Sequence, residues 1–147
     1  MVGITSCSTS KSGVTSNKAS KANISNTWTV SDVYLEGFPN GYEIKSVFDM
    51  APYQEFKGST WSLYGGYGGN ITLTNGISQK IYWSVLNDGF NPIFQFKKID
   101  EGEKAKEVNA GYQLEISSSS KDNLTLRTPF KLLNGNTAYI VYSLVAQ

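Results

Sequence analysis

Residues 81–98 read IYWSVLNDGFNPIFQFKK and contain the pattern that decides the fold. In residues 81–85 and 93–96, large apolar residues alternate with smaller or polar ones, as in strands with one buried face. Asn87, Asp88 and Gly89 lie between the two segments and favour a turn. The stretch therefore predicts two antiparallel strands joined by a short loop.

The same alternation continues from residue 26 to the end of the chain. Turn residues interrupt it, among them the hairpin signal Asn75-Gly76. Asp32 breaks the first segment in the manner of a β-bulge. The last segment, residues 138–145, is nearly all apolar, as expected for a strand that closes a barrel. We predict an all-β fold for residues 26–147: an up-and-down, antiparallel, eight-stranded barrel, just wide enough inside for packed side chains or one small ligand.

Two stretches of this domain need separate interpretation. In residues 43–51, apolar residues Ile44, Val47, Phe48 and Ala51 have helical spacing, so we expect one short helix there, ended by Pro52. Residues 65–69, GGYGG, are predicted to be a hairpin loop. Neither the lysine nor the helix of a phosphate-binding loop follows them.

The composition excludes several classes of function. The 147 residues carry thirteen basic and twelve acidic side chains, a formal charge of +1, and therefore no strong field for nucleic acid. Histidine is absent and Cys7 is the single cysteine, so no Ser-His-Asp or Cys-His catalytic group and no histidine metal site can form. We expect a protein that is not an enzyme, with no catalytic residues, no metal and no cofactor.

The first 25 residues differ in composition from the rest. Residues 8–25 are rich in Ser and Thr, contain three lysines and no acidic residue, and are expected to be a flexible tether. Ile4-Thr5-Ser6-Cys7 resembles the lipobox of bacterial lipoproteins, in which the cysteine is acylated. Residues 1–7 are then the end of a signal sequence, and Cys7 is the lipidation site that anchors the protein to a membrane. The alternative is an incidental cysteine in a disordered tail.

Location follows from the same resemblance. In lipoproteins of the Bacteroidota, an acidic run after the cysteine resembles a surface-export signal. No acidic residue follows Cys7 within the tether. We therefore expect an outer-membrane lipoprotein on the periplasmic side rather than at the cell surface.

The domain also resembles a known family. Trp28 at the start of the first strand is similar to the Gly-x-Trp tryptophan of lipocalins, and residues 26–146 resemble the lipocalin-like domains of Bacteroidota lipoproteins. The resemblance is carried by Trp28, residues 56–61 (FKGSTW), Trp83, residues 94–98 (FQFKK), Gly111-Tyr112 and residues 139–142 (YIVY). The single arginine, Arg127, lies one strand earlier than the arginine that packs on this tryptophan in lipocalins. The resemblance implies a barrel with a closed end and an open end.

Aromatic side chains are the most informative feature. All nineteen lie in residues 26–147, whereas the three tail lysines leave this domain with ten basic and twelve acidic residues. Six are candidates for the lining of an interior cavity: Trp61, Trp83, Phe94, Phe96, Tyr112 and Tyr142. The alternative for each is a filled core. Tyr64, Tyr67 and Phe90 fall in loops and are candidates for a contact surface.

Two functions compete at this point. The first is a ligand-binding barrel that holds a small hydrophobic or amphiphilic molecule in the cell envelope. The second is an accessory or structural lipoprotein subunit that docks on an outer-membrane protein complex and has a filled barrel. A third interpretation is carbohydrate binding through exposed tyrosines.

Overall fold

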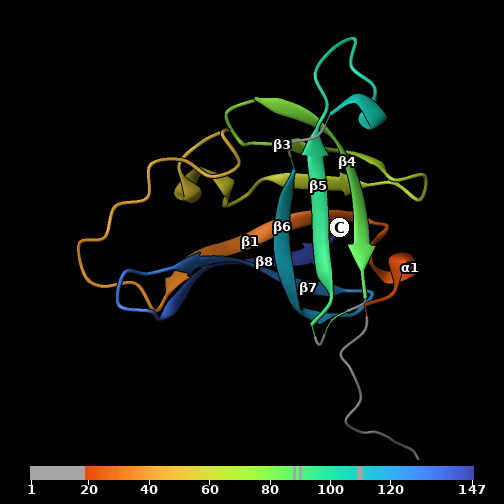
Figure 1. Ribbon diagram of the computed structural model, residues 1–147. Helices are drawn as coiled ribbons and strands as arrows, with labels where there is room; N and C mark the ends of the chain where they lie inside the picture. Colours follow the sequence, from red (N-terminus) through yellow and green to blue (C-terminus); the bar gives the residue numbers. More distant parts are fainter. Residues whose placement is uncertain (1–18, 88, 90, 109–110) are drawn as a thin grey trace, which may run out of the picture.

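The computed structural model describes residues 19–87, 89, 91–108 and 111–147, and these form a closed antiparallel barrel (Figure 1). Its strands are β1 (Thr27–Glu36), β2 (Thr60–Leu63), β3 (Gly68–Thr72), β4 (Ser78–Leu86), β5 (Ile93–Lys98), β6 (Tyr112–Ser119), β7 (Asn123–Lys131) and β8 (Thr137–Ala146). Each strand pairs with the next in sequence, and β8 pairs with β1. The predicted eight-stranded up-and-down barrel is confirmed.

Closure of the barrel depends on the first and last strands. Eight register positions join β1 to β8, with a shift between Val30 and Asp32 where the sequence indicated a bulge. The apolar strand β8 buries residues on both faces, Ile140 and Val141 among them. A closed sheet has no free edge, which removes the usual route to edge-to-edge aggregation.

The barrel interior contains the residues that the alternating pattern assigned to it. Trp28, Trp61 and Trp83 are fully buried, and the N–H group of each indole has an acceptor. Of the predicted inward residues, Val85 and Tyr112 are the two that remain partly exposed. The other core residues from the alternating segments are Val30, Leu63, Ile71, Leu73, Ile81, Phe94, Phe96, Leu114, Ile116, Leu124, Leu126, Ile140, Tyr142 and Leu144. The segments outside the strands add Ala19, Ile24, Val47, Phe48, Ala51 and Phe56.

The predicted tether extended too far toward the barrel. Residues Lys21–Ile24 form a short helix, α1, and Ser20 caps it by accepting hydrogen bonds from the N–H groups of Ala22 and Asn23. Ile24 is fully buried, and its carbonyl accepts the indole N–H of Trp28 at 2.9 Å. Burial of Ile24, together with that of Ala19, brings this end of the tail onto the core. Cys7 and residues 8–18 lie outside the described residues. No helix in the described part of the chain is long and apolar enough to cross a membrane.

The predicted helix at 43–51 is wrong. Phe48 and Asp49 have φ angles of 57° and 51°, which lie in the left-handed region and end any right-handed helix. Val47 and Ala51 instead pair across a tight turn, residues 47–51. A 3-10 helix, η1 (Tyr53–Phe56), begins immediately after Pro52. Of the apolar residues with helical spacing, Val47, Phe48 and Ala51 are buried and Ile44 is partly buried, but by packing on the barrel.

The glycine-rich hairpin is shorter than predicted, because Gly68 and Gly69 belong to β3. A Cβ atom at Gly69 would lie 2.4 Å from the carbonyl oxygen of Ser62 on β2. The strands approach each other too closely here for any other residue. Among the described residues, 64–67 alone make the connection between β2 and β3.

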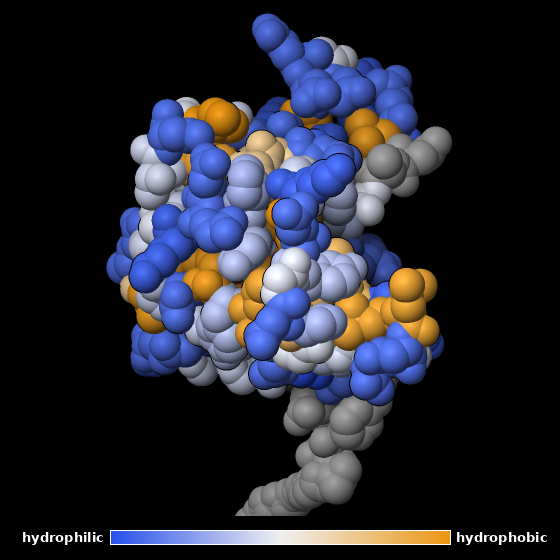
Figure 2. Space-filling view, turned by 90° about the vertical axis from the view of Figure 1, so that its left-hand side faces the viewer, coloured by the Kyte–Doolittle hydropathy of each residue, from blue (hydrophilic) through white to orange (hydrophobic). Residues whose placement is uncertain are grey.

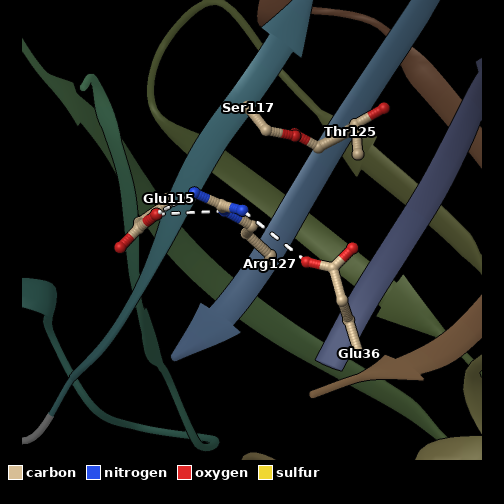
Figure 3. Close-up of polar contacts among 5 residues, drawn as sticks. All are labelled: Glu36, Glu115, Ser117, Thr125 and Arg127. Carbon is tan, nitrogen blue, oxygen red and sulfur yellow. Dashed lines mark hydrogen bonds and ion pairs between the residues drawn. The ribbon is translucent and has the colours of Figure 1, made fainter. Parts of the chain in front are cut away.

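Arg127 stabilises the outside of the barrel (Figure 3). Its guanidinium lies 2.9 Å from a carboxylate oxygen of Glu115 on β6 and 3.9 Å from one of Glu36 on β1. It also lies over the ring of Tyr139 on β8, 4.0 Å from the ring centroid. Arg127 thus links four strands on the outer face, and it is not a counterpart of the lipocalin arginine.

Candidate functional site at the mouth of the barrel

The two ends of the barrel differ. β5 begins after the loop that holds Asn87, whose side chain exchanges two hydrogen bonds with the backbone of Ala19, next to α1. β5 ends at Lys98, whose ammonium group donates to the carbonyl of Asp49 at 3.2 Å. Helix α1 therefore lies at one end, and the turn 47–51 lies at the other, which we call the mouth (Figure 1).

Five of the six predicted lining residues are buried side by side in the barrel. Trp61 lies 6.3 Å from Phe94 and from Phe96, and 6.1 Å from Tyr142, between ring centroids. Trp83 stacks on Phe94 at 5.9 Å. The sixth residue, Tyr112, lies at the mouth, where its ring is 5.2 Å from Phe96. The structure brings all six together in one cluster of aromatic rings.

Phe48 completes this cluster, and the sequence did not single it out as a site residue. Its ring lies 5.0 Å from Phe96, 5.4 Å from Tyr112 and 5.9 Å from Tyr142. It also contacts Phe56 and Trp61, at 5.6 and 6.3 Å. Phe48 belongs to the connection between β1 and β2, so a side chain from outside the strands occupies the centre of the mouth. The sequence signal that could have identified Phe48 is an aromatic residue in a long connection between two strands, shortly before Pro52, which would end a helix.

The turn that carries Phe48 is strained and held by polar contacts at its edge. Two successive non-glycine residues in the left-handed region, Phe48 and Asp49, cost about 1–2 kcal/mol each. The hydroxyl of Tyr112 donates to the Asp49 carboxylate at 3.0 Å, in an exposed position. Lys98 donates to the backbone of the same residue. Burial of the Phe48 ring offsets the strain, and the polar contacts fix the turn.

Polar groups inside the barrel are paired. Ser59 is fully buried; its hydroxyl accepts the indole N–H of Trp61 at 3.1 Å and donates to the carbonyl of Phe56 at 2.6 Å. Thr128 donates to the hydroxyl oxygen of Tyr142 at 3.4 Å. Within the described ranges, every buried side-chain nitrogen or oxygen has a partner. The interior therefore offers a ligand apolar contact rather than unmet hydrogen bonds.

The environment raises the pKa of two tyrosines in this cluster above the ordinary 10.0. Burial raises the pKa of Tyr142, and the hydrogen bond from Thr128 opposes this only in part. Burial also raises the pKa of Tyr112, and the hydrogen bond to Asp49 and the charge of its carboxylate raise it further. Both phenols are therefore neutral in the folded protein over the physiological range.

These shifts predict loss of stability in alkali. The folded-state pKa values lie above the unfolded value of 10.0. The two neutral tyrosines therefore contribute fully to the free energy of unfolding below that pH, and this contribution is lost as the pH rises toward the folded-state pKa values. In Tyr142→Phe, the free energy of unfolding should fall less steeply than in the wild type. Urea unfolding from about pH 9 to about pH 12 measures this. Parallel slopes for the two proteins would contradict it.

The predicted loop contact surface lies at the opposite end from Phe48. Tyr64 and Tyr67 are 54% and 37% exposed, and the Lys21 ammonium of α1 lies 3.5 Å from the ring centroid of Tyr67. They therefore do not line the mouth. Phe90, the third predicted loop residue, lies outside the described residues. In the part of the chain that the structure describes, no group of three or more acidic residues is arranged to hold a metal ion.

Comparison of the chain with protein-family models, with curated proteins and with solved structures gives no match.

Proposed function

We propose that the protein is a non-enzymatic ligand-binding barrel that takes up a small hydrophobic or amphiphilic molecule through the mouth, in exchange for the side chain of Phe48. The observation that carries the proposal is the position of Phe48: an aromatic ring on a strained turn inserted among five other aromatic rings of the interior and the mouth. Strain of this kind clusters at functional sites. An apolar ligand would meet the surfaces that Phe48 now covers.

The rim of the mouth favours an amphiphile over a plain hydrocarbon. Lys98 and Tyr112 both reach Asp49 at this rim, and Lys98 lies 5.8 Å from the Tyr112 ring centroid. Displacement of the turn would release an ammonium and a phenol hydroxyl beside an apolar interior. A ligand with an apolar body and a polar or anionic head would satisfy both regions.

The membrane anchor is part of the same proposal and depends on Cys7 and the Ser/Thr/Lys-rich tether. Two or more acyl chains on Cys7 would hold the protein stably in a bilayer. Because α1 follows the tether and lies opposite the mouth, an anchored barrel would carry its mouth at the end remote from the tether. Mass spectrometry of the N-terminal peptide from protein purified from its native membranes tests the acylation.

The polar contacts at Asp49 should control entry of a ligand. Tyr112→Phe removes the hydroxyl that donates to Asp49 but retains the ring on Phe48. Losing an exposed hydrogen bond of roughly 1 kcal/mol should raise the rate of binding of the apolar fluorophore N-phenyl-1-naphthylamine several-fold in stopped flow. Tyr139→Phe is the matched control, since Tyr139 lies outside the barrel beneath Arg127. Equal rates in the wild type and Tyr112→Phe would argue against this role.

The second candidate, an accessory subunit of an outer-membrane complex, is favoured by two observations. Tyr64 and Tyr67 are exposed at the end of the barrel that carries α1, with the Lys21 ammonium over the ring of Tyr67, and buried side chains fill the interior in the described part of the chain. Purification from native membranes separates the two proposals. A monomer from which organic solvent extracts a bound lipid supports the ligand-binding barrel. A stoichiometric protein partner without such a lipid supports the accessory subunit.

A further inference from the structure

A groove of about 590 Å³ lies on the outer face of the barrel, over β4, β5 and β6. It is lined by Tyr82, Ser84, Gln95, Phe96, Lys97, Gly111, Tyr112 and Gln113. In Figure 2 the surface is hollowed in profile on the right-hand side, below the part of the chain that follows β5. Its floor is formed by outward-facing side chains of these strands, and two residues of its lining, Phe96 and Tyr112, also belong to the aromatic cluster of the interior and the mouth.

Two rows of side chains cross the floor of the groove. In the first row, Tyr82 on β4 lies opposite Lys97 on β5. In the second row, Ser84, Gln95 and Gln113 lie side by side on β4, β5 and β6. Gln113 donates to the amide oxygen of Gln95 at 3.2 Å, and Gln95 donates to the hydroxyl of Ser84 at 2.8 Å. The second row is therefore a hydrogen-bonded series of neutral polar groups.

This series keeps capacity for a ligand. A glutamine amide has two hydrogens and an oxygen with two lone pairs, and a serine hydroxyl can both donate and accept. The two bonds within the row use one hydrogen of each amide. The bonds also fix the orientation of the amides, so little side-chain entropy remains to be lost on binding.

Tyr82 provides a flat aromatic surface beside this row. Its side chain is 40% exposed, and Gly68 lies opposite it on β3 with no side chain to cover the ring. Tyr67 packs beside Tyr82, with ring centroids 6.0 Å apart. The two rings thus extend an apolar surface from the groove toward the β2–β3 connection.

We propose that the groove binds a neutral carbohydrate chain. The C–H groups on one face of a pyranose ring carry partial positive charge and pack on the negative face of an aromatic ring. The hydroxyl groups at its edge need donors and acceptors in alternation, which the Ser84–Gln95–Gln113 row provides. Lys97 is the single charged residue of the lining, and its ammonium donates to the carbonyl of Ala105 at 3.0 Å, so the groove offers an anionic ligand one positive charge among neutral polar groups.

The test is affinity electrophoresis of the full chain in native gels that contain soluble β-glucan, arabinoxylan, galactomannan or dextran, with dextran sulfate as the charged comparison. We expect at least one neutral polysaccharide to retard the protein, and calorimetry with that polysaccharide to give its Kd. Tyr82→Ala and Gln113→Ala should each weaken binding by about threefold to tenfold. Tyr34→Ala is the matched control, because Tyr34 is 44% exposed on β1, away from the groove.

Each outcome bears on the proposal. Retardation that Tyr82→Ala and Gln113→Ala both reduce, and Tyr34→Ala does not, supports it. Absence of retardation by all four neutral polysaccharides overturns it, as does retardation by dextran sulfate alone or binding that Tyr82→Ala leaves unchanged. Thermal unfolding of each variant shows whether it is folded, and both substitutions are at partly or fully exposed outer positions. The interior ligand and the groove are measured with different probes, so either proposal can fail alone.

Discussion

Phe48→Ala is expected to increase the affinity of the barrel for N-phenyl-1-naphthylamine by about tenfold or more, because removing the ring leaves space among apolar side chains. The vacated volume is bordered by Phe56, Phe96, Tyr112 and Tyr142. A cavity lined mainly by apolar rings accepts small aromatic molecules. Fluorescence titration of the wild type and the variant gives both dissociation constants.

The same substitution should lower the stability of the free protein. Truncation of a buried phenylalanine lowers the free energy of unfolding by about 3–5 kcal/mol. We expect about 3 kcal/mol for Phe48→Ala, because relaxation of the turn 47–51 recovers part of the loss. Saturating probe should restore part of the loss, since a ligand that binds only the folded state stabilises it by mass action. Urea unfolding with and without probe measures both effects.

A control in the same connection makes the result specific. Phe38 lies 4.9 Å from Tyr42 and 5.5 Å from Phe130, between ring centroids, and is partly buried outside the central cluster. Phe38→Ala should lower stability without raising probe affinity. If both variants bind the probe equally, the effect is general loosening of the connection. If neither binds more tightly than the wild type, the interior is not a site for apolar ligands.

Trp28→Ala should cause the largest loss of stability, about 3–5 kcal/mol. The indole is fully buried at the α1 end of the barrel, and its N–H group donates to the carbonyl of Ile24. Removing it leaves a large cavity and a carbonyl without its partner, and it takes away the contact that holds α1 on the core. Chemical unfolding followed by circular dichroism gives the free energy directly.

Trp28→Phe separates packing from hydrogen bonding at this position. Phenylalanine keeps most of the apolar volume but cannot donate to Ile24, so we expect a smaller loss, of roughly 1–3 kcal/mol. In both variants, backbone amides of α1 should exchange hydrogen faster than in the wild type. Unchanged exchange in α1 with the full loss of stability would show that the helix is not held by Trp28.

Much of the barrel follows from the sequence because the relevant signal is local. In a strand, successive side chains point to opposite faces, so the positions of Trp83, Phe94, Leu114 and Leu126 on one register are visible without any knowledge of pairing. The bulge beside Asp32 and closure by the apolar last strand also follow from short stretches of sequence. The six candidate lining residues converge for the same reason: the inward register of a closed barrel leads to one interior.

The errors occurred where a local pattern and a distant contact favour different conformations. Residues 43–51 have the spacing of an amphipathic helix, yet Phe48 is buried by rings from β2, β5, β6 and β8. That burial outweighs the cost of the left-handed turn. Ile24 gave no signal in a polar tail, because its burial depends on Trp28 and the barrel end. Tertiary packing overrides weak local preference in both places.

The sequence by itself determined the class of fold, the inward register of the strands, the absence of histidine chemistry and a candidate anchor at Cys7. Only the tertiary structure decided what occupies the mouth, which end carries Tyr64 and Tyr67, and that Tyr82, Gln95 and Gln113 share an outer groove. The division has a physical reason. Strand periodicity is a property of neighbouring residues, whereas a site is made of side chains from separate strands, and their meeting depends on register and on the packing of loops.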